Sequence, residues 1–528
     1  MTLLLTVPQQ APISKAARMH LINNKRWLAD LCWEDTGVCL QQILIRLKEQ
    51  NRCSMKPPKR WSLLEEFQHP LQQLEETIDR NLINCRLPLP PALADEARIA
   101  AEIEMEMAYG YKIILLQQAH AFHATPPNAQ VTQRTLFHLY LTYCRSSLQY
   151  QPIPEGLWFE IHQLFHSCTK NLRHRTLTHP RAPEKICSIA GAYLQAILIG
   201  VFNPHQQLIS TTLAACTFLG EYSGAAKLSI YRKPDSSRGK FIIEPVLDLP
   251  AKPLALIDQN SALSATWLLD TKPLTMRLRK LWRERNTRKY TPIVADKFFI
   301  SRALRAWDLV PNRISARLSK KSGCTVVFSL PACHQLLHNK SLLIPDHLLQ
   351  YTTSPTRKIV DSRYRFIQQL LANHESATQH PIVDWYSINE SPTGLCLCGT
   401  TSNQLTLDLG SVLAMDIDHE AWHIGIVRWV RQHPQALLQL GVENLGPGIT
   451  PVATMLDTSH RVTDIVSALL IPQNPLLERP VSLLIDPGRY SKGQSLLLDD
   501  GHTLYRFSCV KLLEQHHYFD LLALQATT

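Results

Sequence analysis

The feature that most constrains the fold of this chain is a change in hydrophobic periodicity at about Pro311. Between about residues 20 and 205, apolar residues recur at three- and four-residue spacing and proline clusters separate the runs, which is typical of an α-helical bundle. After Pro311 the apolar runs are short and rich in β-branched residues, which indicates a small antiparallel β-barrel. The sequence therefore predicts a multidomain α+β protein in which an N-terminal helical bundle precedes a barrel and a C-terminal β-rich unit.

The length of 528 residues fits three or four domains, at about 150 residues per domain. Two strands around a polar turn are expected at 226–247, basic helices at 274–288 and 293–309, and one further helix at about 458–470. We predict a helical domain at 1–205, a mixed region of strands and basic helices at 206–310, a barrel at 311–456 with an insertion at about 331–383, and a β-rich region at 457–528.

The composition is that of a globular protein, with 45% hydrophobic and 19% charged residues, and it excludes disorder and collagen-like structure. No apolar run is long enough to cross a bilayer, and the first residues lack the basic stretch of a secretory signal, so we expect a cytoplasmic protein. The 13 cysteines are scattered, and Cys396 and Cys398 have no second pair to complete a zinc site. We therefore expect reduced cysteines that pack in the core.

The formal net charge of +11 is concentrated in the segment 272–321, which has 15 basic and three acidic residues. Such a run is often the solvated face of a helix, and it also suits an anionic partner, either a nucleic acid or a phosphorylated small molecule. A nucleic-acid-binding protein that uses this segment is therefore an alternative function. The aromatic residues within the segment are few, which disfavours stacking on single strands.

One motif suggests metal chemistry but stands in the wrong context. The residues from His419 to His423 match the zinc-binding pattern H-E-x-x-H, which requires a helix. The residues from His423 onward predict a strand, on which the two histidines would lie roughly 13 Å apart. The sequence also lacks a phosphate-binding glycine loop and a nucleophile elbow. We therefore expect no catalytic residue, no metal and no cofactor in a protein that is not an enzyme.

Two short motifs accompany the predicted barrel strands. The first is R-x-x-x-R, formed by Arg313 and Arg317 just before the first strand. The second is N-x-S-x-x-G, formed by Asn389, Ser391 and Gly394 at a turn between two strands. Taken alone, the second motif is compatible with an ordinary hairpin, in which Asn and Ser bond backbone amides and Gly takes a positive φ.

In this order and followed by short strands, the two motifs resemble the PilZ domain, a bacterial receptor module for the second messenger cyclic di-GMP. The resemblance covers about 311–456 and includes the turn sequence DWYSINESPTGLCL and the strand sequences LGSVLAMD, WHIGIVRWVR and LLQLGVENLG. It implies a non-enzymatic receptor in signal transduction, whose ligand is cyclic di-GMP and whose binding residues are Arg313, Arg317, Asn389, Ser391 and Gly394.

The chemistry of this ligand suits these residue types. Cyclic di-GMP has two phosphodiesters and two guanines, and a guanidinium can bind the O6/N7 acceptor pair of a guanine with two hydrogen bonds. Asn389 and Ser391 would bind the other guanine edge. Because Arg313 and Arg317 follow directly on the basic helices, ligand binding would relay a signal to the helical region and to a protein partner that the sequence does not identify.

The spacing of the motifs departs from that of the family, because residues 318–388 separate them where the family has a short strand. An insertion after the first strand would leave the geometry intact. Alternatively the clamp is Arg357, Arg363 or Arg365. If neither set of arginines reaches the turn, the barrel is ligand-free and the protein has a structural or interaction role.

Overall fold

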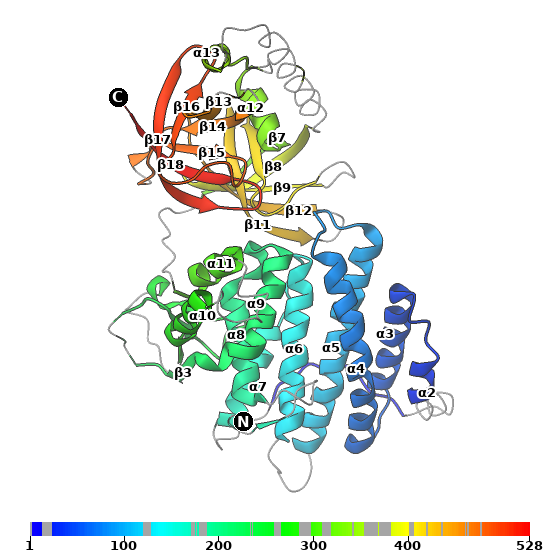
Figure 1. Ribbon diagram of the computed structural model, residues 1–528. Coiled ribbons are helices and arrows are strands. Elements are labelled where there is room, and N and C mark those ends of the chain that lie inside the picture. The colour runs from blue at the N-terminus through cyan, green and yellow to red at the C-terminus, as the bar shows by residue number, and fades with distance from the viewer. Residues whose placement is uncertain are drawn as a thin grey trace. The chain divides into compact units, whose positions relative to one another are not determined.

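A computed structural model shows two compact units, one comprising residues 1–85 and 89–312 and the other residues 86–88 and 313–528 (Figure 1). The structure describes residues 3–12, 24–119, 128–169, 175, 177–178, 187–232, 234, 236–257, 266–284, 297–308, 318–339, 343–352, 368, 382–400, 406–418, 421–433, 437–459, 461, 464–475 and 478–527.

The first unit consists mainly of α-helices, as the sequence predicted (Figure 1). Asp35, Asn128 and Ser188 cap three of its helices by accepting a hydrogen bond from a backbone amide of the first turn. No helix in the described part of the chain has both the length and the apolar character that a membrane span requires. The helices of the first unit are α2 (Asn24–Ala29), α3 (Thr36–Arg52), α4 (Pro57–Leu82), α5 (Pro91–Ala119), α6 (Ala129–Leu148), α7 (Leu157–Thr169), α8 (Ile189–Phe202), α9 (Ile209–Tyr222), α10 (Lys272–Glu284) and α11 (Lys297–Asp308).

Buried charged side chains join α4, α5 and α6. Arg134 of α6 donates two hydrogen bonds to Glu65 of α4, with N–O distances of 3.0 and 2.8 Å. The hydroxyl of Tyr111 on α5 donates to the same carboxylate at 2.6 Å. About three turns further along the same face of α6, Arg145 pairs with Asp79 of α4. Because a buried charge without its partner is costly, these pairs favour one register of the three helices.

A small antiparallel sheet with strand order β3-β6-β4-β5 completes this unit. It includes the two strands expected within 226–247, and the two basic helices predicted after it are α10 and α11. Trp307 of α11 is buried and donates from its indole nitrogen to the Leu198 carbonyl at 3.1 Å, which ties α11 to α8. The strands of the unit are β1 (Leu177–Thr178), β2 (Cys187–Ser188), β3 (Lys227–Ile230), β4 (Lys240–Ile243), β5 (Lys252–Pro253) and β6 (Trp267–Asp270).

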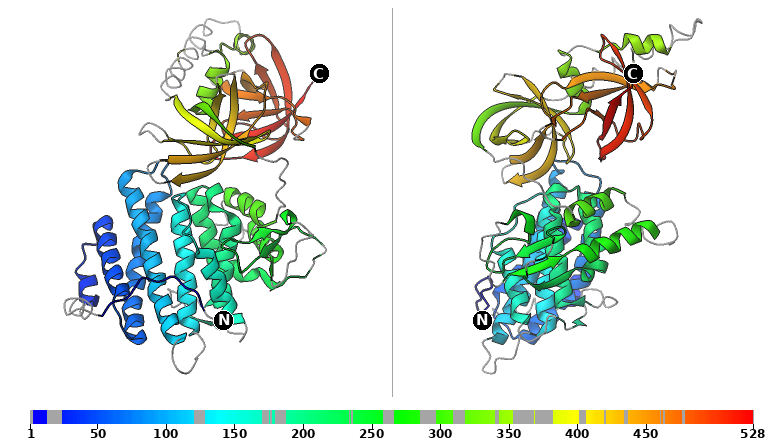
Figure 2. Two further views of the ribbon diagram at one scale, coloured as in Figure 1. Left: turned by 180° about the vertical axis from the view of Figure 1, so that it is seen from behind. Right: turned by 90° about the vertical axis from the view of Figure 1, so that its left-hand side faces the viewer.

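The second unit contains two closed antiparallel barrels, which lie side by side (Figure 2). The first barrel has the order β10-β11-β12-β9-β8-β7, and the strand sequences LGSVLAMD, WHIGIVRWVR and LLQLGVENLG form most of β10, β11 and β12. The segment predicted as an insertion begins with α12 (Leu330–Leu337), and α13 (Asp346–Tyr351) follows it. The strands are β7 (Leu318–Phe328), β8 (Val383–Ser391), β9 (Gly394–Thr400), β10 (Val412–Ile417), β11 (Trp422–His433) and β12 (Leu437–Asn444).

The second barrel contains two segments that the sequence assigned differently. Its order is β13-β14-β15-β18-β17-β16, so Thr450–Leu456, placed with the first barrel from the sequence, is a strand of the second. The helix expected at about 458–470 is wrong, because Val466–Ile471 is strand β14 and pairs with β13 and β15. A short apolar run fits a helix or a strand equally, and here the two neighbouring strands decide. The strands are β13 (Thr450–Leu456), β14 (Val466–Ile471), β15 (Ser482–Ile485), β16 (Ser495–Asp499), β17 (Leu504–Gln515) and β18 (Asp520–Ala526).

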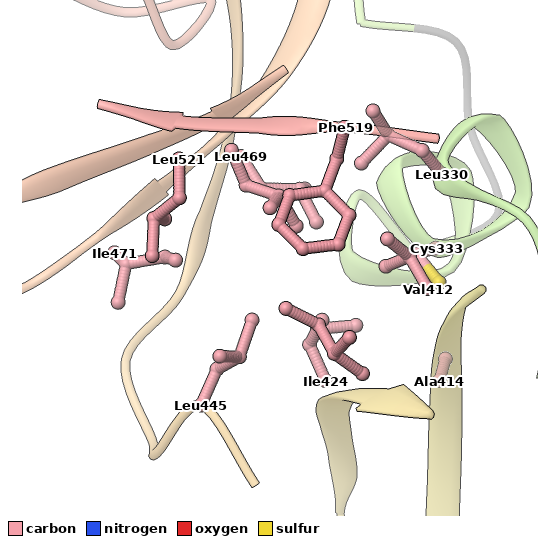
Figure 3. Close-up of a cluster of buried hydrophobic side chains, with 12 residues drawn as sticks. Leu330, Cys333, Val412, Ala414, Ile424, Leu445, Leu469, Ile471, Phe519 and Leu521 are labelled. Atoms are coloured by element: carbon pink, nitrogen blue, oxygen red, sulfur yellow. The ribbon is translucent and has the colours of Figure 1, made fainter. Parts of the chain in front are cut away.

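The two barrels share one hydrophobic cluster, and α12 contributes to it (Figure 3). The ring of Phe519, which precedes β18, lies in the middle of the cluster near Leu330 and Cys333 of α12. The first barrel contributes Val412, Ala414, Ile424 and Ile426, and the second contributes Leu469, Ile471, Leu484 and Leu521. The segment inserted after β7 is therefore part of the core that unites the barrels.

Polar contacts join the same two barrels. The guanidinium of Arg428 on β11 donates to Glu443 of β12 at 2.7 Å and donates two hydrogen bonds to Glu514 of β17 at 2.6 and 2.8 Å. His334 of α12 donates from Nε2 to the Val452 carbonyl of β13 at 3.2 Å, and burial lowers the pKa of this histidine to about 4. The imidazole is therefore neutral near pH 7.

If the shared cluster holds the two barrels together, a substitution within it should destabilise both. Replacing the fully buried Phe519 with Ala leaves a cavity between the barrels and should lower their free energy of unfolding by about 3–5 kcal/mol. The measurement is hydrogen exchange of β15 and β18 peptides from the full chain across a urea series. Val510→Ala, at a site on β17 that is 42% exposed, is the control and should change the free energy by less than about 0.5 kcal/mol. Equal effects of the two substitutions would contradict the shared core.

Candidate functional site

The N-x-S-x-x-G motif forms the hairpin between β8 and β9. Ser391 pairs with Gly394, so Pro392 and Thr393 make a two-residue turn. The hydroxyl of Ser391 donates to the Gly394 carbonyl at 2.9 Å and holds the turn closed. The motif is thus a tight corner of the first barrel, with the hydroxyl oxygen of Ser391 still able to accept hydrogen bonds.

Gly394 does not have the positive φ that an ordinary hairpin would give it, because it is not one of the residues with a left-handed backbone conformation. Instead, a Cβ atom built on Gly394 would lie 2.4 Å from the Val442 carbonyl oxygen of β12. Glycine is needed because the neighbouring strand approaches too closely for a side chain.

Asn389 lies at an irregular point of the sheet. It pairs with Ser319 of β7 and with Cys396 of β9, and the register shifts next to it in both strand pairs. A bulge turns a side chain away from its regular direction. Within the described part of the chain, the buried Oδ1 atom of Asn389 has no hydrogen-bond partner. An acceptor without a partner is costly to bury, so this oxygen is suited to a donor that the protein itself does not provide.

Arg313 and Arg317 lie outside the described residues, and so do the alternative arginines Arg357, Arg363 and Arg365. Strand β7 begins at Leu318, immediately after Arg317, and it is antiparallel to β8. Leu318 pairs with Glu390, and Ser319 pairs with Asn389. The residues directly after R-x-x-x-R therefore lie beside N-x-S-x-x-G, and the intervening residues form an insertion between two paired strands.

Two lysines of β7 lie next to this hairpin. From the sequence they contributed only to the net charge of the basic segment 272–321 and were not predicted as site residues. Lys320 Nζ lies 3.4 Å from Glu390 and 3.6 Å from Asp418, and the charge of Glu390 raises the pKa of Lys320. Lys321 Nζ lies 4.9 Å from the centre of the Tyr386 ring, which is a cation–π distance. The pairing of β7 with β8 and with β10 brings these residues together, so no local sequence signal could have revealed them.

The β7 bulge that carries the two lysines is held by a buried hydroxyl. Ser387 is fully buried, accepts a hydrogen bond from the Ser322 amide at 3.3 Å and donates to the Lys320 carbonyl at 3.2 Å. These bonds replace the ladder bonds that the bulge disrupts. The start of β7 is thereby positioned against the hairpin.

The other motifs give no second site in the described part of the chain. His423 lies on strand β11, as expected, whereas His419 and Glu420 lie outside the described residues. Among the residues that the structure describes, no three histidine, cysteine, aspartate or glutamate side chains lie close enough together to hold a metal ion. In the basic segment, Arg279 of α10 pairs with Asp308 of α11, and Lys280 with Glu284, so part of its charge is compensated within the helices.

Comparisons with known proteins match both halves of the chain. Residues 22–235 match the family model described as the N-terminal domain of the cyclic-di-GMP receptor FimW, and residues 344–451 match the model of its middle PilZ domain. The second range contains the hairpin motif and begins after Arg313, Arg317 and β7. No solved structure gives a significant match.

A curated relative matches over most of its length. The cyclic-di-GMP receptor FimW of Pseudomonas aeruginosa is 23% identical over 525 residues, which cover 90% of this chain and 85% of the relative. The two domain models occur here in the order that their names give, an N-terminal domain before a middle PilZ domain. The chain therefore belongs to the family of PilZ-domain cyclic-di-GMP receptors.

Proposed function

We propose that this chain is a non-enzymatic receptor that binds cyclic di-GMP at the β8–β9 hairpin of its first barrel. The binding residues are Arg313, Arg317, Asn389, Ser391 and Gly394. The observation that carries the proposal is the pairing of Ser319 with Asn389, which supports a single site for the two motifs despite the insertion between them. Membership of the receptor family supports the identity of the ligand.

The polar groups of the hairpin are suited to guanine. Guanine presents an N2 amino donor as well as the O6/N7 acceptors. The Oδ1 atom of Asn389 would accept from the amino edge of one base, because no described group of the protein donates to it. The guanidinium groups of Arg313 and Arg317 would bind the O6/N7 acceptors and the phosphates. Donors and acceptors on the ligand are thus matched by opposite groups on the chain.

The position of the arginines supports a relay role. Residues 309–317 connect α11 of the helical unit with β7 of the barrel, and both arginines are in this connection. A ligand held by both the arginines and the hairpin would constrain the segment that joins the two units. Binding energy would thereby bias the arrangement of that segment, which is the requirement for a ligand-driven change of state. The protein partner that reads this change is not identified by the chain.

The arginine clamp is tested by calorimetric titration of cyclic di-GMP into the full chain. Arg317→Ala should weaken binding by about 1–3 kcal/mol, or about five- to 150-fold in Kd, because a bidentate guanidinium–guanine contact is lost. Arg461→Ala, which removes the same charge from an exposed position of the second barrel, is the control and should leave Kd unchanged.

Two outcomes of this titration would count against the proposal. If the titration of wild-type protein with cyclic di-GMP gives no heat, and cyclic di-GMP does not displace a fluorescent analogue from the protein, the receptor function is wrong for this chain. If Arg363→Ala abolishes binding and Arg317→Ala does not, the ligand is correct and the clamp is the alternative set of arginines.

The hairpin makes a separate prediction. Asn389→Ala removes an acceptor that is free for the ligand, whereas Ser391→Ala removes a hydroxyl whose proton already bonds Gly394. Asn389→Ala should therefore raise Kd at least about tenfold and more than Ser391→Ala, on the basis of about 1.5 kcal/mol for a lost hydrogen bond. Circular dichroism of both variants checks that the barrel remains folded. A larger effect of Ser391→Ala would show that the assigned roles are reversed.

A further inference from the structure

Two cysteines from different helices have their sulfur atoms in contact inside the helical unit. Cys144 of α6 and Cys216 of α9 are both reduced, with 3.6 Å between their Sγ atoms. Cys144 is 4% exposed, whereas Cys216 is half-buried and the next residue, Thr217, is exposed. Of the two cysteines, Cys216 is therefore the more exposed residue and Cys144 the more shielded one.

The groups around the pair distinguish the two thiols. The hydrogen bond from Cys144 lowers the pKa of Cys216, and Tyr140 and Arg145 act in the same direction, while burial and Asp79 oppose them. Burial is the main reason that the pKa of Cys144 is raised. Tyr140 lies one turn before Cys144 on α6, and the two cysteines raise its pKa in addition to burial. Because the pKa of Cys216 is lowered and that of Cys144 is raised, Cys216 is the better nucleophile of the pair.

We propose that Cys144 and Cys216 form an oxidation site at which hydroperoxides convert the two thiols into a disulfide that joins α6 to α9. A partly exposed cysteine whose sulfur lies 3.6 Å from that of a shielded second cysteine is the arrangement that such chemistry requires. The sulfurs must approach by about 1.5 Å to reach the disulfide bond length of about 2.05 Å. The proposal is independent of the ligand of the barrel.

The reaction balances in two steps. The Cys216 thiolate attacks one oxygen of the hydroperoxide, the O–O bond breaks, and the released alkoxide takes a proton to become an alcohol. Cys216 is then a sulfenic acid. The Cys144 sulfur attacks the Cys216 sulfur, an S–S bond forms, and the S–O bond breaks as hydroxide leaves with the Cys144 proton as water. Two thiols are oxidised and one hydroperoxide is reduced to an alcohol and water.

The disulfide would close a loop that contains α7 and α8. A crosslink over a long loop restricts the unfolded chain and raises the stability of the folded form. Oxidised and reduced protein should therefore differ in stability, and dithiothreitol should reverse the difference. This readout does not depend on the detection of the crosslink itself.

To test the proposal, the full reduced chain is treated with cumene hydroperoxide or hydrogen peroxide. The protein is then digested with trypsin and chymotrypsin, and crosslinked peptides are identified by mass spectrometry. Wild type should give a Cys144–Cys216 peptide and a higher midpoint of guanidinium unfolding. In Cys144→Ser, Cys216 should instead accumulate as a sulfenic acid that dimedone labels. Cys32→Ser, at an exposed cysteine, is the control and should form the crosslink as wild type does.

Three results would overturn the proposal. The first is the absence of the Cys144–Cys216 peptide at a dose that oxidises Cys32 of the same sample. The second is equal dimedone labelling of Cys144 in Cys216→Ser and of Cys216 in Cys144→Ser, because the two thiols would then not be distinguished. The third is an unfolding midpoint that oxidation leaves unchanged in protein that contains the crosslink.

Discussion

The antiparallel pairing of β7 with β8 is the contact on which the proposed site depends. It places Ser319 opposite Asn389 although a long insertion separates these strands in the sequence. Without this pairing, the arginine motif and the hairpin motif would be unrelated segments. With it, the residue after Arg317 lies beside the hairpin, and the bulge held by Ser387 fixes the local geometry.

The insertion that separates the motifs also has a structural role. Its first helix, α12, contributes Leu330 and Cys333 to the cluster shared by the two barrels, and His334 reaches β13. The strand that starts beside the hairpin therefore leads directly into the core that unites the barrels. We infer that the second barrel stabilises the first, because removing it would expose the apolar side chains of this cluster.

Sequence periodicity predicted the helices and the strands of the first barrel because these signals are local. The helix expected at about 458–470 is wrong because pairing with the two neighbouring strands, rather than periodicity, makes Val466–Ile471 a strand. Three other features also depend on contacts between strands and could not be read from periodicity. They are the closure of the second barrel, the close approach of Val442 to Gly394, and the contact of Lys321 with Tyr386. Each depends on residues that meet only in the folded chain.

Hydrogen exchange of the full chain with and without cyclic di-GMP tests most directly whether the two motifs form one site. The account predicts that saturating ligand slows exchange in peptides that cover 309–321 and in peptides that cover 386–394, with no comparable slowing in the second barrel. Protection of only one of these segments, or slowing confined to the second barrel, would contradict it.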